Sequence, residues 1–217
     1  MIKSLIKIAE AEVGTTESPR GSNKVKYWSD MNSKMNGQPW CQCFLNWVFV
    51  KAFGTEDARK LLNQPSWTYY TPTAAKAFKD KSLWHSTPEK GDVIYFKNTS
   101  RICHVGLVVD VTSTTVTTIE GNTSKAGFDS NGGGVYKKTY KLTYSGIAGY
   151  GRPPYSTISP GTSEDKSVLK TEDEIVAEVI AGKWGTGNSR KSKLTKAGYD
   201  YASIQAKVNA KLKEVKK

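Results

Sequence analysis

The most informative stretch of the chain reads Pro39-Trp40-Cys41-Gln42-Cys43-Phe44-Leu45, at the point where a polar loop passes into an apolar run. The run continues to Phe53 and ends at Gly54, and its lack of alternation predicts a largely buried helix over 40–53. Cys41 would stand at the N-terminus of that helix, where the helix dipole favours the thiolate. An arbitrary cysteine is more often a small core residue. Cys41 is therefore a candidate nucleophile only if a base lies within reach.

The pattern around this helix changes from helical to extended along the chain. Apolar residues at helical spacing predict an opening helix over 2–13, and the polar stretch 15–37 predicts a long loop. A short helix is expected over 71–79, with Thr71 as N-cap and Pro72 in the first turn. Runs of β-branched and aromatic residues then predict strands at 92–96, 105–111, 115–119, 135–140 and 147–150. Helices followed by a strand meander indicate an α+β domain with an antiparallel sheet.

A candidate base directly precedes the second of these strands, in the stretch Ile102-Cys103-His104-Val105-Gly106-Leu107. Alternation along a strand places His104 and Gly106 on the face opposite the most apolar residues, and the glycine leaves room beside the imidazole. The next strand ends in Ile119-Glu120-Gly121-Asn122, which would bring a carboxylate close to that ring. A nucleophile, a base and a group that orients the base are the minimum set for acyl transfer by a thiol.

The remaining cysteines and the acidic residues indicate no metal site. We expect Cys43 and Cys103 to be core residues, and three cysteines do not make a disulfide framework. Zinc is disfavoured because Cys-x-Cys is not its usual ligand spacing, and because Cys103 and His104 would point to opposite faces of a strand. The stretch 28–38 offers only Asp30, Asn32 and Asn36, too few carboxylates for calcium. We expect neither a metal nor a cofactor.

The chain is basic along its whole length, with a formal net charge of +12 over 217 residues and a pI near 9.5. Residues 157–217 hold twelve Lys/Arg and eight Asp/Glu, so most of the excess lies before them. This charge attracts polyanions, among them nucleic acid, anionic membrane and teichoic acid, and does not choose between them. Residues 1–14 lack an unbroken apolar stretch, so we expect no signal peptide. No apolar run approaches membrane-spanning length.

A second, smaller unit follows a stretch rich in Ser, Thr, Gly and Pro. We expect a linker over 157–170 and three short helices over 171–217. The first helix would begin with Thr171 and Glu174 as a capping box, and the second at Asn188 or Ser189. Asp200 would cap the third, in which Ile204, Val208 and Leu212 recur every four residues.

Four motifs of the first part, in this order, resemble the CHAP domain: Pro-Trp-Cys-x-x-Phe, Gly-Asp-Val-Ile-Tyr-Phe, His-Val-Gly and Glu-Gly-Asn. That family comprises cysteine- and histidine-dependent amidohydrolases and peptidases of peptidoglycan with a papain-like fold. The resemblance spans about residues 5–155 and implies a catalytic domain over 1–156. It implies Cys41 as nucleophile and His104 as general base, with Glu120 orienting His104 and Asn122 assisting. Beside the nucleophile, Gln38 is a candidate second oxyanion donor and Trp40 a candidate substrate contact.

The second unit is similar to the CW_7 repeat, a wall-binding module, over residues 171–212. This resemblance implies binding to the muropeptide part of peptidoglycan. Trp184 offers an apolar face to a sugar ring, or else fills a small core. Arg190 offers a fork for a peptide carboxylate, and Asp200 either accepts hydrogen bonds from the ligand or caps a helix.

Together these features predict a phage-type lysin, made in the host cytoplasm and acting on the wall after membrane permeabilisation. Its partner would be bacterial peptidoglycan, with no membrane insertion and with self-association left open. Nucleic acid is disfavoured because no base-reading motif or basic stripe with interleaved aromatics occurs. Two alternatives to a phage-type lysin are a host autolysin and a non-catalytic protein that binds the wall or nucleic acid. The bond cut, muramoyl-alanine amide or peptide, is equally open.

Overall fold

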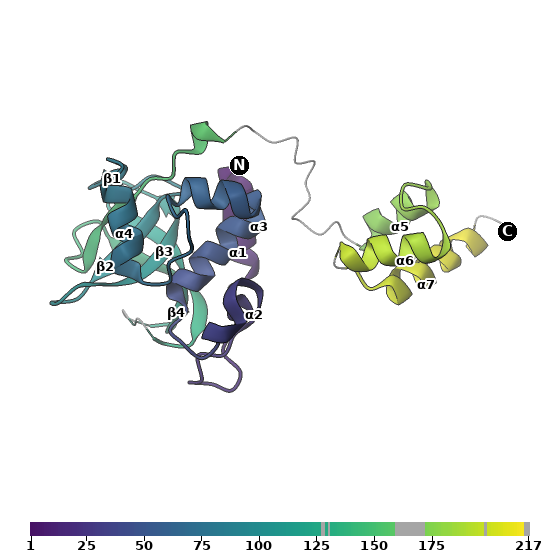
Figure 1. The fold of residues 1–217 in the computed structure, drawn as a ribbon, viewed down its shortest axis with the longest axis horizontal. Coiled ribbons are helices and arrows are strands. Elements are labelled where there is room, and N and C mark those ends of the chain that lie inside the picture. Colours follow the sequence, from purple (N-terminus) through teal and green to yellow (C-terminus); the bar gives the residue numbers. More distant parts are fainter. Residues whose placement is uncertain (127–128, 130, 159–171, 198, 215–217) are drawn as a thin grey trace. The chain divides into compact units, whose positions relative to one another are not determined.

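The computed structural model describes residues 1–126, 129, 131–158, 172–197 and 199–214 (Figure 1). Contacts along the chain divide it into two units, Met1–Thr162 and Ser163–Lys217. Each unit is described by itself. The predicted cap at Thr171 and most of the predicted linker lie outside the described residues.

The first unit places helices before a sheet. The helices are α1 (Ile2–Ala11), α2 (Lys26–Asn32), the 3-10 turn η1 (Ser33–Met35), α3 (Cys41–Leu61) and α4 (Thr71–Lys79). The strands are β1 (Trp84–His85), β2 (Val93–Lys97), β3 (Ile102–Val111), β4 (Thr115–Thr123), β5 (Gly134–Lys141) and β6 (Ile147–Gly151), before the turn η2 (Tyr155–Thr157). In the described residues they form one antiparallel sheet in the order β1-β6-β2-β3-β4-β5. The predicted α+β class, with N-terminal helices packed on an antiparallel sheet, is confirmed.

The sheet is apolar on both faces. Helices α1, α3 and α4 pack on β3, and together with the sheet they enclose the main core, to which Val105, Leu107 and Val109 contribute (Figure 1). The alternate residues of the strands build a second, smaller cluster, which includes Phe96 and Val108. Because His104 alternates with Val105 along β3, it shares the face of Gly106 and Val108.

Helix α3 carries the predicted nucleophile at its first position. The backbone N–H groups in the first turn of a helix have no partner inside the helix. In α3 the N-cap is Trp40, whose side chain accepts no hydrogen bond from them. The predicted stop at Gly54 is confirmed as a kink, where φ is 76° and ψ is 167°. A second helical segment then runs to Leu61, beyond the predicted end.

The structure corrects three local predictions in the first unit. The stretch 15–37 is not all loop, because α2 lies within it and is anchored by the fully buried rings of Tyr27 and Trp28. Thr71 is not the cap of α4: Tyr70 holds that position, and the Thr71 hydroxyl donates to the Ile102 carbonyl at 3.2 Å. The short strand β1 was not predicted.

The second unit contains α5 (Glu172–Ile180), α6 (Gly187–Lys196) and α7 (Tyr201–Glu214), which confirms the three predicted helices. Its core consists of the buried residues Ile175, Val176, Val179, Leu194, Ile204 and Val208. The N-cap of α6 is Thr186, so the predicted caps Asn188 and Ser189 are wrong by two or three positions. Leu212 departs from the predicted apolar stripe, since 44% of it is exposed. None of the helices described in either unit is long and apolar enough to cross a membrane.

Candidate active site

Cys41 is a free, buried cysteine at the first position of α3, with 6% of its surface exposed. Cys43 is fully buried two residues later, and burial raises the pKa of its thiol far above the usual range. Burial also raises the pKa of the half-buried Cys103. The helix N-terminus thus distinguishes Cys41 from the two other thiols.

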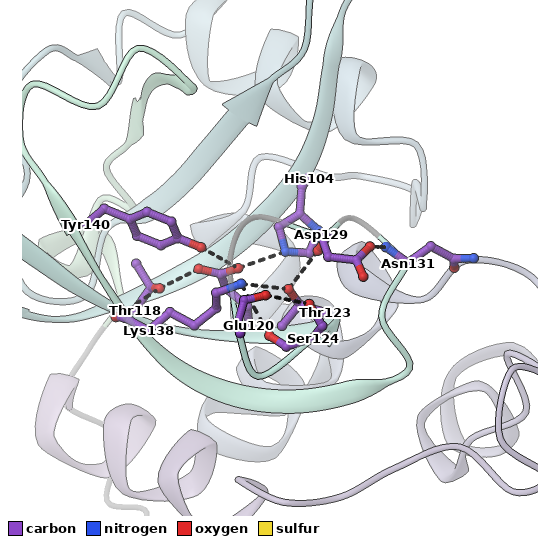
Figure 2. A network of polar contacts seen from close by, with 10 residues as sticks. His104, Thr118, Glu120, Thr123, Ser124, Asp129, Asn131, Lys138 and Tyr140 are labelled. Atoms are coloured by element: carbon purple, nitrogen blue, oxygen red, sulfur yellow. Dashed lines mark hydrogen bonds and ion pairs between the residues drawn. The ribbon is translucent and has the colours of Figure 1, made fainter.

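His104 and Glu120 form a buried pair across β3 and β4. The imidazole Nε2 lies 3.0 Å from Glu120 Oε2, and both side chains are fully buried (Figure 2). Gly106 makes this approach possible, because a Cβ at that position would lie 2.7 Å from Glu120 Cγ. The room predicted beside the imidazole is therefore occupied by the carboxylate.

The pKa of His104 links the pair to the thiol. Burial is the largest single influence and lowers this pKa, because it penalises the imidazolium. Hydrogen bonds to the side chains of Cys41 and Glu120, together with the negative charges of both, outweigh burial and raise the pKa to about 9. The raised pKa of His104 therefore reflects two neighbouring groups, the Cys41 thiol and the Glu120 carboxylate, of which Glu120 lies on Nε2.

Two hydroxyl groups complete the surroundings of Glu120. The Thr118 hydroxyl donates to Oε1 at 2.5 Å, and the Tyr140 hydroxyl donates to Oε2 at 3.2 Å (Figure 2). Burial and the Glu120 carboxylate raise the pKa of Tyr140 well above its usual value, so it stays a donor. Sequence reasoning missed both residues. Strand alternation could have indicated Thr118, which lies two positions before Glu120, whereas Tyr140 depends on the pairing of β4 with β5.

Asn122 lies two residues beyond Glu120, fully buried and in the left-handed region with φ at 58°. Its amide donates to Asn131 Oδ1 at 3.0 Å. Nearby, the buried ammonium group of Lys138 donates to Thr123 Oγ1 at 3.2 Å and to the carbonyl of the next residue at 3.3 Å (Figure 2). These contacts tie the end of β4 to the segment that follows it.

Comparison with known proteins agrees with this geometry. Residues 33–122 match the CHAP domain, and residues 173–212 match the CW_7 repeat. The first unit is therefore similar to a CHAP domain and the second to a CW_7 repeat, and each match covers less than half of the chain. The CHAP match includes Cys41, His104, Glu120 and Asn122, although it is shorter than the range over which the motifs indicated the resemblance.

Comparisons with curated proteins and with solved structures show only distant similarity. No curated protein matches the sequence. The crystal structure of Ly7917 is similar at 15% identity and a TM-score of 0.46, covering 71% of this chain and 62% of that chain. The structure of Ly7917 with the hydrolyzing product of MDP is similar at 14% identity and the same TM-score, covering 71% and 63%. This chain therefore spans less than two thirds of the length of these structures.

The two candidate contacts that precede Cys41, Gln38 and Trp40, have different surroundings. Gln38 is exposed, and its backbone carbonyl accepts the Trp28 indole at 2.8 Å. Trp40 is fully buried, packs against Tyr27 and donates to Glu17 Oε1 at 2.9 Å. The expected substrate contact by Trp40 is therefore wrong, because its ring belongs to the core. The oxyanion role of Gln38 stays a prediction.

In the CW_7 repeat, all three predicted wall contacts also have structural roles. Trp184 is half-buried against the core, and its indole donates to Glu178 at 3.1 Å. Arg190 donates from Nε to the Gly185 carbonyl at 2.9 Å and from Nη1 to Gln205 at 3.0 Å. Asp200 Oδ1 accepts hydrogen bonds from the N–H groups of residues 202 and 203, at 2.7 and 3.2 Å. Asp200 therefore caps α7, which is one of the two roles predicted for it. Their contact with the wall stays a prediction.

The described residues contain no group of three or more His, Cys, Asp or Glu side chains placed to hold a metal ion. In the stretch considered for calcium, the Asp30 carboxylate already accepts the Trp47 indole at 2.7 Å and pairs with Lys51 at 3.3 Å.

Proposed function

We propose that the protein hydrolyses an amide bond of bacterial peptidoglycan with Cys41 as its nucleophile. One observation carries the proposal: the buried imidazole of His104 lies 3.0 Å from the Glu120 carboxylate, and interactions with Glu120 and with Cys41, at the N-terminus of α3, raise its pKa to about 9. A thiol, an oriented imidazole and a carboxylate are what acyl transfer requires. The presence of a CHAP domain supports the substrate class, because the family acts on peptidoglycan.

The mechanism follows from the pKa of His104. His104, whose pKa is raised to about 9, takes up the proton of the Cys41 thiol. The sulfur attacks the amide carbonyl carbon, and His104 gives its proton to the nitrogen as the carbon–nitrogen bond breaks. Water, deprotonated by His104, then cleaves the thioester, releasing the carboxylic acid and restoring the thiol. The backbone N–H of Cys41, at the first position of α3, would stabilise the oxyanion.

The bond itself is one of two kinds, N-acetylmuramoyl-L-alanine or a peptide bond of the stem or cross-bridge. Both reactions use the same nucleophile and base. Mass spectrometry of digested walls distinguishes them: an amidase releases intact stem peptides from the glycan, whereas an endopeptidase leaves part of the stem on muramic acid.

The CW_7 repeat would hold the enzyme on its substrate, and we propose this for residues 173–212. A catalytic domain joined to a wall-binding repeat suits a phage-type lysin, made in the host cytoplasm and released to the wall. A host autolysin is the alternative. Expression during phage growth, as opposed to expression during host cell division, distinguishes the two.

The decisive test is Cys41→Ser with Cys103→Ser as its matched control. We expect Cys41→Ser to abolish the release of soluble fragments from purified walls while leaving the thermal unfolding midpoint close to that of the wild type. Cys103 is half-buried and precedes His104 on β3, so alternation turns its side chain to the opposite face, and its serine variant should keep most of the activity. Substantial turnover by Cys41→Ser would remove the nucleophile assignment. A wild-type protein that binds walls without releasing fragments would favour the non-catalytic alternative.

A further inference from the structure

Glu120 is a carboxylate with no exposed surface that accepts hydrogen bonds from three side chains. His104 and Tyr140 share Oε2, at 3.0 and 3.2 Å, and Thr118 donates to Oε1 at 2.5 Å. Burial disfavours the charge of a carboxylate, and hydrogen bonds donated to it restore that charge. The imidazole supplies only one of the three donors.

We propose that Thr118 and Tyr140 are positioning residues that hold the Glu120 carboxylate aimed at His104, and so set the lower end of the pH range in which the thiol is active. This inference rests on the proposed function, since it concerns the same three groups. Neither hydroxyl touches the thiol in the described contacts. Both act through the carboxylate.

The strands explain why these two hydroxyl groups are well placed. Thr118 lies on β4 two positions before Glu120, so alternation brings its side chain to the same face. Tyr140 lies on β5, beside β4 in the sheet, and its ring is fixed between aromatic neighbours. The ring centroid lies 4.9 Å from that of Phe96 and 5.5 Å from that of Tyr144, on which it stacks at 17°.

This packing allows the hydroxyl to be removed without moving the ring. In Tyr140→Phe the ring contacts with Phe96 and Tyr144 remain, while Glu120 Oε2 keeps only the imidazole donor. In Thr118→Val the shape is retained and Oε1 loses its donor. A carboxylate that has lost these donors is held less firmly against Nε2, so it supports the imidazolium of His104 less well.

The matched controls lie beside each residue. Tyr144→Phe removes a phenol hydroxyl from the ring stacked on Tyr140, and the described hydroxyl contacts of Glu120 remain. Thr117→Val removes the hydroxyl of the preceding residue on β4, which points to the other face and pairs with Thr139 at 3.1 Å.

The experiment measures two rates of the full chain as a function of pH. The first is the initial rate of wall digestion. The second is the rate at which iodoacetamide alkylates Cys41, measured by mass spectrometry of the peptide that contains Cys41. We expect the acid limb of both profiles to move to higher pH by about one unit in Tyr140→Phe and Thr118→Val, because a hydrogen bond to a charged group shifts ionisation by on the order of tenfold. The double variant should shift further, and the controls should follow the wild type.

Two outcomes overturn the proposal. In the first, the acid limb of Tyr140→Phe and Thr118→Val coincides with that of the wild type, so the hydroxyls only pack. In the second, Tyr144→Phe and Thr117→Val shift it equally, so the effect is not specific to Glu120. The two assays test the two proposals separately. A wild-type protein that digests no wall at any pH contradicts the proposed function. The pH dependence of Cys41 alkylation tests the positioning role even in that case.

Discussion

A histidine with no exposed surface would ordinarily be neutral at pH 7, because burial penalises the imidazolium. His104 departs from this rule because both of its ring partners carry or can carry negative charge. The raised pKa of His104 therefore depends on Cys41 and Glu120 together. Removing either side chain should lower this pKa and favour the neutral ring. A measured pKa of His104 therefore shows whether Cys41 lies close enough to interact with the ring.

The titration of His104 tests this contact without any substrate. In the wild type we expect a pKa of about 9, visible in the imidazole resonances of a histidine-labelled sample and as an alkaline fall in activity near that pH. In Cys41→Ala the hydrogen bond and the thiolate charge are lost while burial remains, so the pKa should fall. The chain has only two histidines, and His85, at the sheet edge, serves as the internal reference. A His104 titration unchanged by Cys41→Ala would contradict the thiol contact.

The sequence indicated the three candidate residues that the structure brings together, and it did not indicate the residues that support them. Cys41, His104 and Glu120 could be chosen because their chemistry is uncommon at such positions. Thr118 and Tyr140 are ordinary strand residues whose role depends on which strands pair and in which register. Trp40 was misjudged because its burial depends on Tyr27 and on a glutamate 23 positions away.

At the scale of elements, one glycine limits how closely α3, which begins with Cys41, packs on β4, which carries Glu120. A Cβ at Gly121 would lie 2.6 Å from both Cβ and Cγ of Phe44, which stands in the first turn of α3. Carbon atoms do not approach so closely, so α3 can pack on β4 only because residue 121 has no side chain. Glu120 immediately precedes this contact.

We therefore expect Gly121→Ala to impair both the site and the fold. The added methyl group must push α3 away from β4, at a cost of about 1–3 kcal/mol of unfolding free energy. Activity should fall more than stability alone explains, because Cys41 and Glu120 lie on the two separated elements. The measurements are denaturant unfolding and wall digestion well below the unfolding midpoint. Phe44→Ala in the same chain should restore part of the lost activity by making room. Full activity of Gly121→Ala would contradict this account of the packing.

The elements themselves were predictable where periodicity is strong. Helix α4 and the longer strands lie close to their expected positions, and the predicted break at Gly54 is present. Helix α2 was missed because its seven residues are mostly polar and two aromatic rings hold it to the core. Strand β1 was missed because two residues carry no period, and only pairing with β6 defines it.

At the scale of the whole chain, the two units have separate cores and separate family matches. Among the described residues, the first core extends over four helices and one face of a sheet, whereas the second contains six buried side chains and three partly buried aromatic rings. A core this small supplies only a few kcal/mol. The CW_7 repeat should therefore be far easier to unfold than the CHAP domain, which allows its contribution to be removed selectively.

Ile204→Asp is designed to unfold the repeat within the full chain. Ile204 is fully buried in that core, and an unpaired carboxylate there costs more than so small a unit can supply. We expect loss of the weaker of two thermal transitions, loss of retention on purified walls, and unchanged cleavage of soluble muropeptides. Leu212→Asp is the matched control, because Leu212 lies on the same helix with 44% of it exposed, so retention should persist. If Ile204→Asp still binds walls as tightly as the wild type at physiological salt, the positive charge of the CHAP domain, and not the repeat, holds the protein on its substrate.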